Sequence, residues 1–153
     1  METITEAEAR QFFADALVAH IGVLANGDPY VSPVSFVLDE NRILFRTKPG
    51  KRFEGLIANP RVSIEASRFD EDTGDWTSVI IQGRAVERTD PATTTQTVEL
   101  LFEKYVKYMG SPLSGSGFQE MATFPHIVEV SVDSITGMVS GRGLSNRTRP
   151  GRL

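Results

Sequence analysis

The chain of 153 residues contains no cysteine, and its only histidines are His20 and His126. The absence of cysteine excludes disulfides, thiolate nucleophiles, iron–sulfur clusters and cysteine-ligated zinc. Two imidazoles are too few for a histidine-rich metal centre within one chain. The sequence also lacks the Gly-x-Ser-x-Gly and HExxH motifs, which disfavours hydrolytic chemistry. We therefore expect any chemistry to come from a bound cofactor that carries its own reactivity.

Positive charge is in the minority, with 16 lysines and arginines against 20 aspartates and glutamates. Because contacts to polyanions need clustered positive charge, we expect no nucleic-acid binding, and an anionic ligand needs a local basic site. Long apolar runs are also missing, since the longest nearly uncharged run, residues 16–25, is far short of the ~20 residues that cross a bilayer. The acidic start, Met1–Glu6, does not resemble a signal peptide. We expect a cytoplasmic protein that binds no membrane.

The hydrophobic pattern predicts three helices among short strands. Thr5 and Glu8 form a capping-box pattern at the first helix, Lys51–Ala58 reads as a short helix, and Asp90 begins a longer one. The long helix carries an apolar stripe of Val98, Leu101, Phe102, Tyr105 and Met109. Strands are expected at residues 21–25, 30–38, 43–47, 62–66, 76–87, 127–132 and 135–139.

The short connections between these strands predict an antiparallel sheet, which a closed or partly closed barrel would protect from exposed edges. The fold class is therefore all-β-dominated α+β. We expect one domain over residues 1–141, followed by a polar, arginine-rich tail over residues 142–153. Gly83 interrupts the longest strand and predicts a bulge or a close backbone approach.

The most informative stretch runs from a strand end at Arg46-Thr47 through Pro49-Gly50 to a helix start at Lys51-Arg52. The first N–H groups of a helix have no internal partner, and the helix dipole is positive there. Free amides, a hydroxyl and several cations thus converge, which is the chemistry of a phosphate site. A solvated basic turn is the alternative interpretation.

Other residues are open to two interpretations. Trp76, the only tryptophan, is either a core or interface aromatic or the wall of a pocket for a flat ligand. Ser32 and Ser35 flank Pro33-Val34 in a strand, and Pro33 should lie on a sheet edge or beside a ligand because it has no N–H to donate. The two histidines are expected to be structural.

Taken together, five segments resemble the FMN-binding split-barrel family related to pyridoxamine 5'-phosphate oxidase. The resemblance covers roughly Ile21 to Asp90, with weaker likeness in the first helix and in the strand after His126. The segments are Tyr30–Phe36, Leu44–Thr47, Gly50–Arg52, Asn59–Val62 and Trp76–Ala85.

The resemblance implies an antiparallel split β-barrel with flanking helices, forming a homodimer with two FMN sites at the subunit interface. The FMN phosphate would bind Thr47, Lys51 and Arg52, with Arg46 beside them. The remaining implied flavin contacts are the backbone at Ser32, Pro33, Val34 and Ser35, and the side chains of Ser78 and Gln82, from one or the other subunit.

The sequence departs from pyridoxamine 5'-phosphate oxidases proper. Those enzymes carry Arg where this chain has Ser32, Lys at Val37 and Gln at Ser78, together with an Arg-x-His substrate element that is missing here. Oxidation of pyridoxamine phosphate is therefore not expected. The chain is more similar to the branch of small actinobacterial and nitroimidazole-resistance-like flavoproteins.

These features predict an FMN-dependent oxidoreductase that passes hydride from a nicotinamide or deazaflavin donor to a small acceptor. The protein would supply orientation and electrostatics, without a covalent catalyst. A non-catalytic flavin-binding or redox-sensing dimer is one alternative. A haem-binding relative, which needs an axial histidine such as His126, is another.

Overall fold

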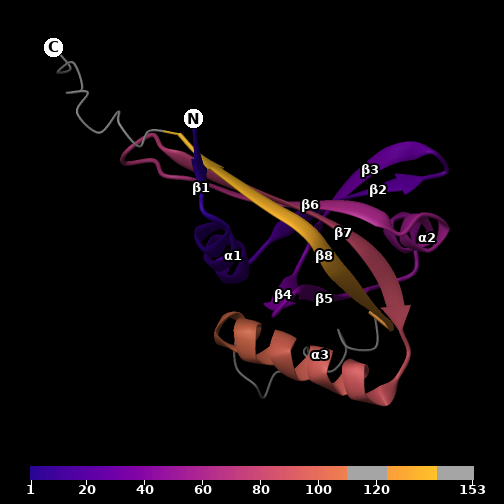
Figure 1. The fold of residues 1–153 in the computed structure, drawn as a ribbon. Coiled ribbons are helices and arrows are strands. Elements are labelled where there is room, and N and C mark those ends of the chain that lie inside the picture. Colours follow the sequence, from indigo (N-terminus) through magenta and orange to yellow (C-terminus); the bar gives the residue numbers. More distant parts are fainter. Residues whose placement is uncertain (110–123, 141–153) are drawn as a thin grey trace, which may run out of the picture.

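The structure is a computed structural model that describes residues 1–109 and 124–140 (Figure 1). The arginine-rich tail expected at residues 142–153 lies outside the described residues. In chain order, the elements are β1 (Glu2–Ile4), α1 (Glu6–Asp15), β2 (Ala19–Ala25), β3 (Asp28–Val34), β4 (Phe36–Asp39), β5 (Arg42–Thr47), α2 (Lys51–Ala58), β6 (Arg61–Phe69), β7 (Trp76–Arg88), α3 (Pro91–Tyr105), the 3-10 helix η1 (Val106–Tyr108) and β8 (His126–Val139).

All the strands belong to one antiparallel sheet in the order β3-β2-β6-β7-β8-β5-β4, with β1 paired to β8. Only Ser35 separates β3 from β4, yet these strands are the two ends of that order. The sheet must therefore curl until its two ends meet within about two residues, roughly 7 Å. No ladder joins these ends in the described part of the chain. This open seam confirms the expected antiparallel split barrel.

The helices cover different parts of this barrel. Figure 1 shows α2 beside the β2–β3 hairpin, α1 near β1, and α3 along the lower end near β4 and β5. The capping box expected at α1 is present, since Thr5 and Glu8 bond each other's backbone N–H groups. Phe13 of α1 is fully buried and packs on Phe36 with 4.6 Å between ring centroids. No helix among the described residues is long and apolar enough to cross a membrane.

Several strand boundaries differ from the expected ones because pairing extends or divides them. The single strand expected over residues 30–38 is wrong, since the chain breaks at Ser35 and its halves join opposite ends of the sheet. The two strands expected after His126 form one strand, β8, because β7 pairs with β8 on both sides of Asp133, from Ile127 to Val139. The charged loop expected from Arg68 begins two residues later, because Phe69 still pairs with Trp76.

The bulge expected at Gly83 is confirmed. The β7–β8 register shifts between Gln82 and Gly83, so Asp133 of β8 has no cross-strand partner on β7. A Cβ atom at Gly83 would lie 2.5 Å from the carbonyl oxygen of Ser131, a distance that no side chain tolerates. Glycine is therefore required here because two backbones approach closely. The extra residue of the bulge, Asp133, belongs to β8.

The long helix α3 exists as expected, with Asp90 as its cap, and it buries part of the expected stripe, since Val98, Leu101 and Tyr105 are half-buried. Thr93 and Thr97 are its buried residues, whereas Phe102 is 55% exposed and Met109 is 42% exposed. Threonine can be buried here because the Thr97 hydroxyl donates to the carbonyl oxygen of Thr93 at 2.8 Å. The apolar stripe thus predicted the helix correctly and its packing in part, because Phe102 and Met109 are exposed.

Candidate functional site

The guanidinium of Arg52 brings the predicted phosphate residues together across the seam of the barrel. Its Nε and Nη2 donate to Oγ1 of Thr47 on β5, at 3.2 and 3.1 Å. Its Nη1 donates to the carbonyl oxygen of Pro33 at 2.7 Å and to Oγ of Ser32 at 3.1 Å, both on β3. One side chain therefore links β3, at one end of the sheet, to β5, the strand next to the other end.

This arginine carries a charge that its neighbours do not neutralise. Its hydrogen bonds all go to neutral oxygens, and among the described residues no carboxylate lies within ion-pair distance of it. Burial lowers the pKa of Arg52, and the neighbouring Tyr30 opposes that shift. Thr47 beneath it is 1% exposed. A half-buried cation without a counter-charge favours an anionic ligand, because the ligand would restore neutrality.

The start of α2 adds free amides to this cation. Gly50 occupies the N-cap position and supplies no side-chain cap. Its φ of 147° and ψ of -172° belong to a region that is essentially restricted to glycine. The exposed Lys51 follows, with its Nζ 5.3 Å from the centroid of the Tyr30 ring. Uncapped N–H groups, a helix dipole and two cations therefore face the same region, as a phosphate site requires.

A histidine that the sequence analysis treated as structural, or as the axial ligand of the haem alternative, lies beside this cluster. His126 is the cross-strand partner of Thr47, so both side chains are on the inner face of the barrel. Its ring stacks on Phe53 of α2, with centroids 3.8 Å apart and planes at 14°. Its Nδ1 lies 2.8 Å from Oε1 of Glu87. Sequence reasoning missed this group because Glu87 and His126 meet only through the pairing of β7, β8 and β5.

Arg46, the neighbour of Thr47, is not brought to Arg52. Successive side chains of a strand point to opposite faces, so Arg46 projects away from the Thr47 side. Its Nη2 donates to the carbonyl oxygen of Phe124 at 2.8 Å, and burial lowers its pKa. In this structure Arg46 therefore supports the segment before β8.

The four residues from Ser32 to Ser35 have separate environments. Ser32 contacts Arg52, and Val34 is buried in the core. Pro33 is exposed on β3, which is a terminal strand of the sheet, so the expectation that it lies on an edge is confirmed. Ser35 is exposed at the break between β3 and β4. Because successive side chains of β3 point to opposite faces of the sheet, Tyr30 and Ser32 lie on the same face. This shared face could have been predicted from the sequence.

The remaining predicted residues lie far along β7 from this cluster. Trp76 begins β7 and Arg88 ends it, and Arg88 pairs with the neighbour of His126. Twelve residues of strand at ~3.3 Å each place Trp76 about 40 Å from that end. Ser78 donates to Oε1 of Glu65 at 3.0 Å, and Gln82 accepts from Ser63 at 2.9 Å. Within one chain these three residues do not join Arg52.

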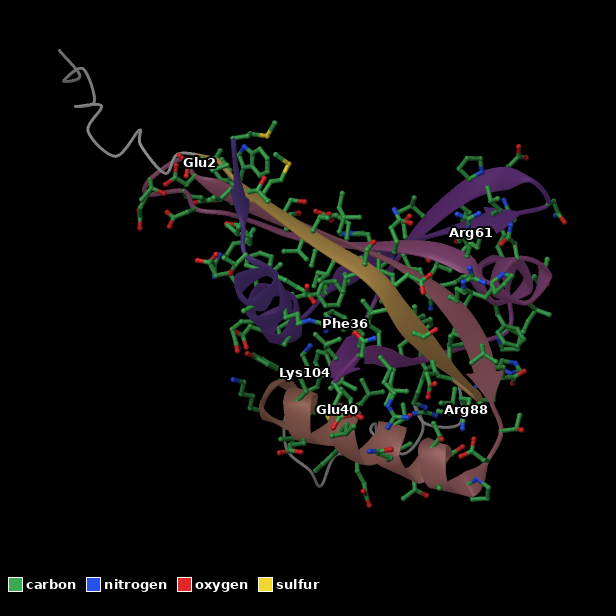
Figure 2. All side chains as sticks on the ribbon, in the orientation of Figure 1. Glu2, Phe36, Glu40, Arg61, Arg88 and Lys104 are labelled. Atoms are coloured by element: carbon green, nitrogen blue, oxygen red, sulfur yellow. The ribbon has the colours of Figure 1, made fainter. Side chains whose placement is uncertain are left out.

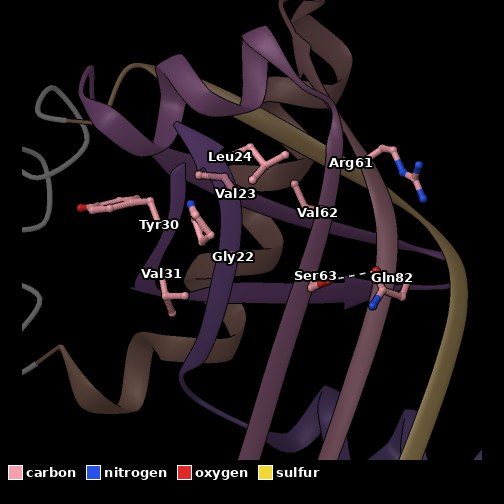
Figure 3. A pocket seen from close by; sticks show the side chains of 10 residues that line it. Gly22, Val23, Leu24, Tyr30, Val31, Arg61, Val62, Ser63 and Gln82 are labelled. Carbon is pink, nitrogen blue, oxygen red and sulfur yellow. Dashed lines mark hydrogen bonds between the residues drawn. The ribbon is translucent and has the colours of Figure 1, made fainter. Parts of the chain in front are cut away.

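Ser63 and Gln82 border an open depression on the outer face of the sheet (Figure 3). Its volume is about 240 Å³, and Tyr30 and Arg61 lie at its opposite ends. Large apolar side chains are exposed on the same face, including Leu24 at 41%, Val31 at 64% and Ile80 at 42%. An apolar surface rimmed by polar residues is typical of an interaction site.

Comparison with known families identifies the fold. The family model described as pyridoxamine 5'-phosphate oxidase matches residues 5–139. The chain belongs to this family. An uncharacterized protein of Rhizobium meliloti is 26% identical over 87 residues, and the alignment spans 57% of this chain and 57% of that relative.

Solved structures of the family share the architecture. An FAD-binding protein of Mesorhizobium loti superposes with a TM-score of 0.72 at 22% identity, covering 92% of this chain and 98% of that chain. A Bacteroides thetaiotaomicron protein provisionally assigned to 5-nitroimidazole antibiotic resistance superposes with a TM-score of 0.70 at 20% identity. The match covers 90% of this chain and 86% of that chain. A flavocytochrome of Azotobacter vinelandii superposes with a TM-score of 0.67 at 17% identity. The match covers 90% of this chain and 68% of that chain. At these identities, the likeness establishes the fold.

Proposed function

We propose that the protein is an FMN-dependent oxidoreductase that passes hydride from a nicotinamide or deazaflavin donor to a small acceptor. The observation that carries this proposal is the Arg52 guanidinium, which is half-buried and, among residues 1–109 and 124–140, bonds only to Thr47, Ser32 and Pro33. Those residues and the uncapped start of α2 fit the phosphate of a flavin mononucleotide. The FAD-binding and flavocytochrome names of structural neighbours support a flavin ligand.

When bound, the flavin would supply the redox chemistry, since it accepts and donates hydride. The side chains of this chain would then bind and orient it. Arg52 and Lys51 would neutralise the phosphate, and the Thr47 hydroxyl would donate to a phosphate oxygen after exchanging its present contact. Glu87 and Phe53 would hold His126 in a fixed orientation at the edge of this site.

We further propose a homodimer in which a second copy covers the outer face of the sheet. Leu24, Val31 and Ile80 expose apolar area there that a monomer would leave in water. Ser78 and Gln82 lie on the same face, far from the Arg52 cluster of their own chain. A second copy would bring these residues, and Trp76 at the strand start, toward a cofactor held by its partner.

A haem-binding relative is the second candidate, and one contact favours it. Histidines that bind metals usually donate their other ring N–H to a carboxylate, and Nδ1 of His126 lies 2.8 Å from Glu87. The stacking of Phe53 on the ring limits the space beside it, because the centroids are only 3.8 Å apart. We therefore favour the flavin.

The deciding experiment is the absorption spectrum of the freshly purified protein, followed by mass analysis of what denaturation releases. Flavin absorption bands together with released FMN would support the proposal. Released FAD would show that the flavin is FAD instead of FMN, and a Soret band would show that the cofactor is haem. Rapid-mixing reduction by nicotinamide and deazaflavin donors separates an oxidoreductase from a non-catalytic flavin binder. Light scattering should give about twice 16.8 kDa, and a flavin-bound monomer would contradict the dimer.

A further inference from the structure

A carboxylate and an imidazole meet at the end of the barrel where β7 ends and β8 begins. Nδ1 of His126 lies 2.8 Å from Oε1 of Glu87, and these side chains are only 25% and 30% exposed. Figure 2 labels Arg88, the residue after Glu87, at this end of β7. Among the described residues, no other cation lies within ion-pair distance of Glu87. The contact has the length of a charge-assisted hydrogen bond.

This hydrogen bond decides which ring nitrogen of His126 carries a proton. An ionised carboxylate can only accept, so Nδ1 must hold a hydrogen in order to donate to Glu87. Nε2 is then an acceptor in the neutral ring and a donor only in the imidazolium. Phe53 stacks on one face of the ring, with centroids 3.8 Å apart, so two contacts fix the orientation of His126.

The fixed orientation turns Nε2 toward the predicted phosphate residues. Strand β8 lies between β7 and β5, so Glu87 and Thr47 flank His126 on its two sides. The two nitrogens of an imidazole point away from each other, and a ring with Nδ1 turned to β7 therefore directs Nε2 toward β5. Direct cross-strand partners such as Thr47 and His126 have Cβ atoms about 4.5–5.5 Å apart. Since the Thr47 hydroxyl accepts from Arg52 at 3.1 Å, three polar groups converge there.

The charges around this point favour the imidazolium when a phosphate is bound. The groups that face the ring are Glu87 of β7, the cations Lys51 and Arg52 of α2, and the neutral Thr47 of β5. With His126 neutral, these groups leave one positive charge, and with His126 protonated they leave two. A phosphate monoester carries about 1.5–2 negative charges near pH 7. The protonated ring therefore gives the closer match to the ligand.

We propose that His126, held as an imidazolium by Glu87, donates from Nε2 to the phosphate of the ligand bound at Thr47 and Arg52. This inference rests on the proposed function, which identifies that ligand as FMN. Glu87 is a positioning residue, because it acts through the ring. A ring that is neutral in the free protein would take up a proton from solvent when the phosphate binds, since it gains a second anionic partner. A haem ligand needs an unprotonated Nε2, so the two roles exclude each other.

The first test compares FMN with riboflavin, by fluorescence titration of the apoprotein. The ratio of the two affinities isolates the contribution of the phosphate. His126→Gln should lower this ratio at least about tenfold, as expected for one charge-assisted hydrogen bond. Glu87→Gln keeps the imidazole and should lower the ratio less.

The matched control is His20→Gln, because His20 lies on the outer face of the sheet and is exposed. A disturbed dimer would change both affinities together and leave their ratio intact. A ratio for His126→Gln equal to that of His20→Gln would overturn the proposal.

The second test reads the charge of the ring and needs no substitution at His126. The chain has two histidines, so the His20→Gln variant assigns the signals of His126. Nitrogen-15 NMR is recorded at a pH where this ring is mostly neutral in the free protein. FMN should bring both ring nitrogens to the protonated state, and riboflavin should not. A purely structural His126 would stay neutral with FMN bound, which would contradict the proposal.

Inorganic phosphate separates this inference from the proposed function. If FMN does not bind and phosphate alone protonates His126, the flavin proposal fails and the phosphate contact stands. If FMN binds while the affinity ratio and the nitrogen signals are independent of His126, the flavin stands and this inference fails. A ring that responds to neither FMN nor phosphate would also overturn the inference.

Discussion

The two helices α2 and α3 begin in opposite ways, although each starts directly after a strand. At α3, the Asp90 carboxylate accepts from the N–H of Thr93 at 3.0 Å and from its hydroxyl at 2.6 Å, and Arg88 bonds the same carboxylate. At α2, Gly50 offers no side chain, and the residues that follow are cations. The positive dipole at the start of α3 is neutralised by the Asp90 carboxylate, whereas the start of α2 adds positive charge to a positive dipole.

The far ends of these helices extend the contrast. Tyr105 near the end of α3 donates to the carbonyl oxygen of Leu17 at 2.7 Å and accepts from the N–H of Phe36 at 3.0 Å. Lys104 donates to the carbonyl oxygen of Phe36 at 3.0 Å, and Figure 2 shows the two residues close together. The polar ends of α3 are thus used for folding. The start of α2 has unbonded amides and cations available for a ligand, so a helix start without a side-chain cap can mark a binding site.

The largest expected effect concerns the start of α2, which has no side-chain cap. In K51A/R52A, FMN affinity should fall by about 1.5–3 kcal/mol for each charge-assisted contact that is lost. The affinity for riboflavin, which lacks the phosphate, should fall far less. Fluorescence titration of the apoprotein with both ligands measures the difference. Equal losses for the two ligands would contradict a phosphate role for α2.

The second prediction concerns the backbone that leaves α2 uncapped. Gly50→Ala should lower the free energy of unfolding by about 1–3 kcal/mol, because alanine resists a φ of 147°. A steric clash is not the cause, since no atom of the described residues beyond the two chain neighbours lies within 4 Å of the added Cβ. Urea denaturation measures the loss. Gly22→Ala is the control, because its Cβ would make only ordinary contacts and its φ is not positive.

The third prediction concerns the anchored end of α3. Tyr105→Phe should destabilise the protein by about 1–3 kcal/mol, because the N–H of Phe36 loses its acceptor in a partly buried place. Phosphate binding at α2 should not change. The control is Tyr108→Phe, since Tyr108 is 56% exposed. Equal unfolding midpoints for both variants would show that the Tyr105 hydroxyl is dispensable.

The smallest expected effect concerns the Asp90 cap of α3, and it depends on pH. Hydrogen bonds from Thr93 hold the pKa of Asp90 well below its usual range, and Arg88 adds to this. A carboxylate whose folded pKa is depressed stabilises the fold above its unfolded pKa and loses that contribution as pH falls toward the folded one.

Asp90→Ala should therefore lower the Tm at pH 7, and its gap to wild type should narrow as pH falls below about 4. Thermal denaturation at several pH values measures this gap. The exposed Glu99 of α3 provides the control, and Glu99→Ala should show a much smaller gap at pH 7. A gap for Asp90→Ala that stays constant down to pH 2 would show that its charge is irrelevant.

The local features of the fold could be predicted from the amino-acid sequence. Alternation and turn residues predicted most strands, the Thr5–Glu8 box and Asp90 predicted two helix starts, and Gly83 predicted the bulge. The phosphate cluster was readable because Thr47, Lys51 and Arg52 lie within six residues of one another. Such signals are local, so propensity, capping and charge spacing are enough to reveal them.

The contacts between residues far apart in the sequence could not be predicted and depend on how the sheet closes. One residue, Ser35, sends the chain to the opposite end of the sheet, and this closure brings Pro33 within reach of Arg52. Pairing of β5 with β8 places His126 beside Thr47, and pairing of β7 with β8 brings Glu87 to the His126 ring. Cross-strand register is fixed by burial of the whole sheet, so no local pattern of the sequence contains it.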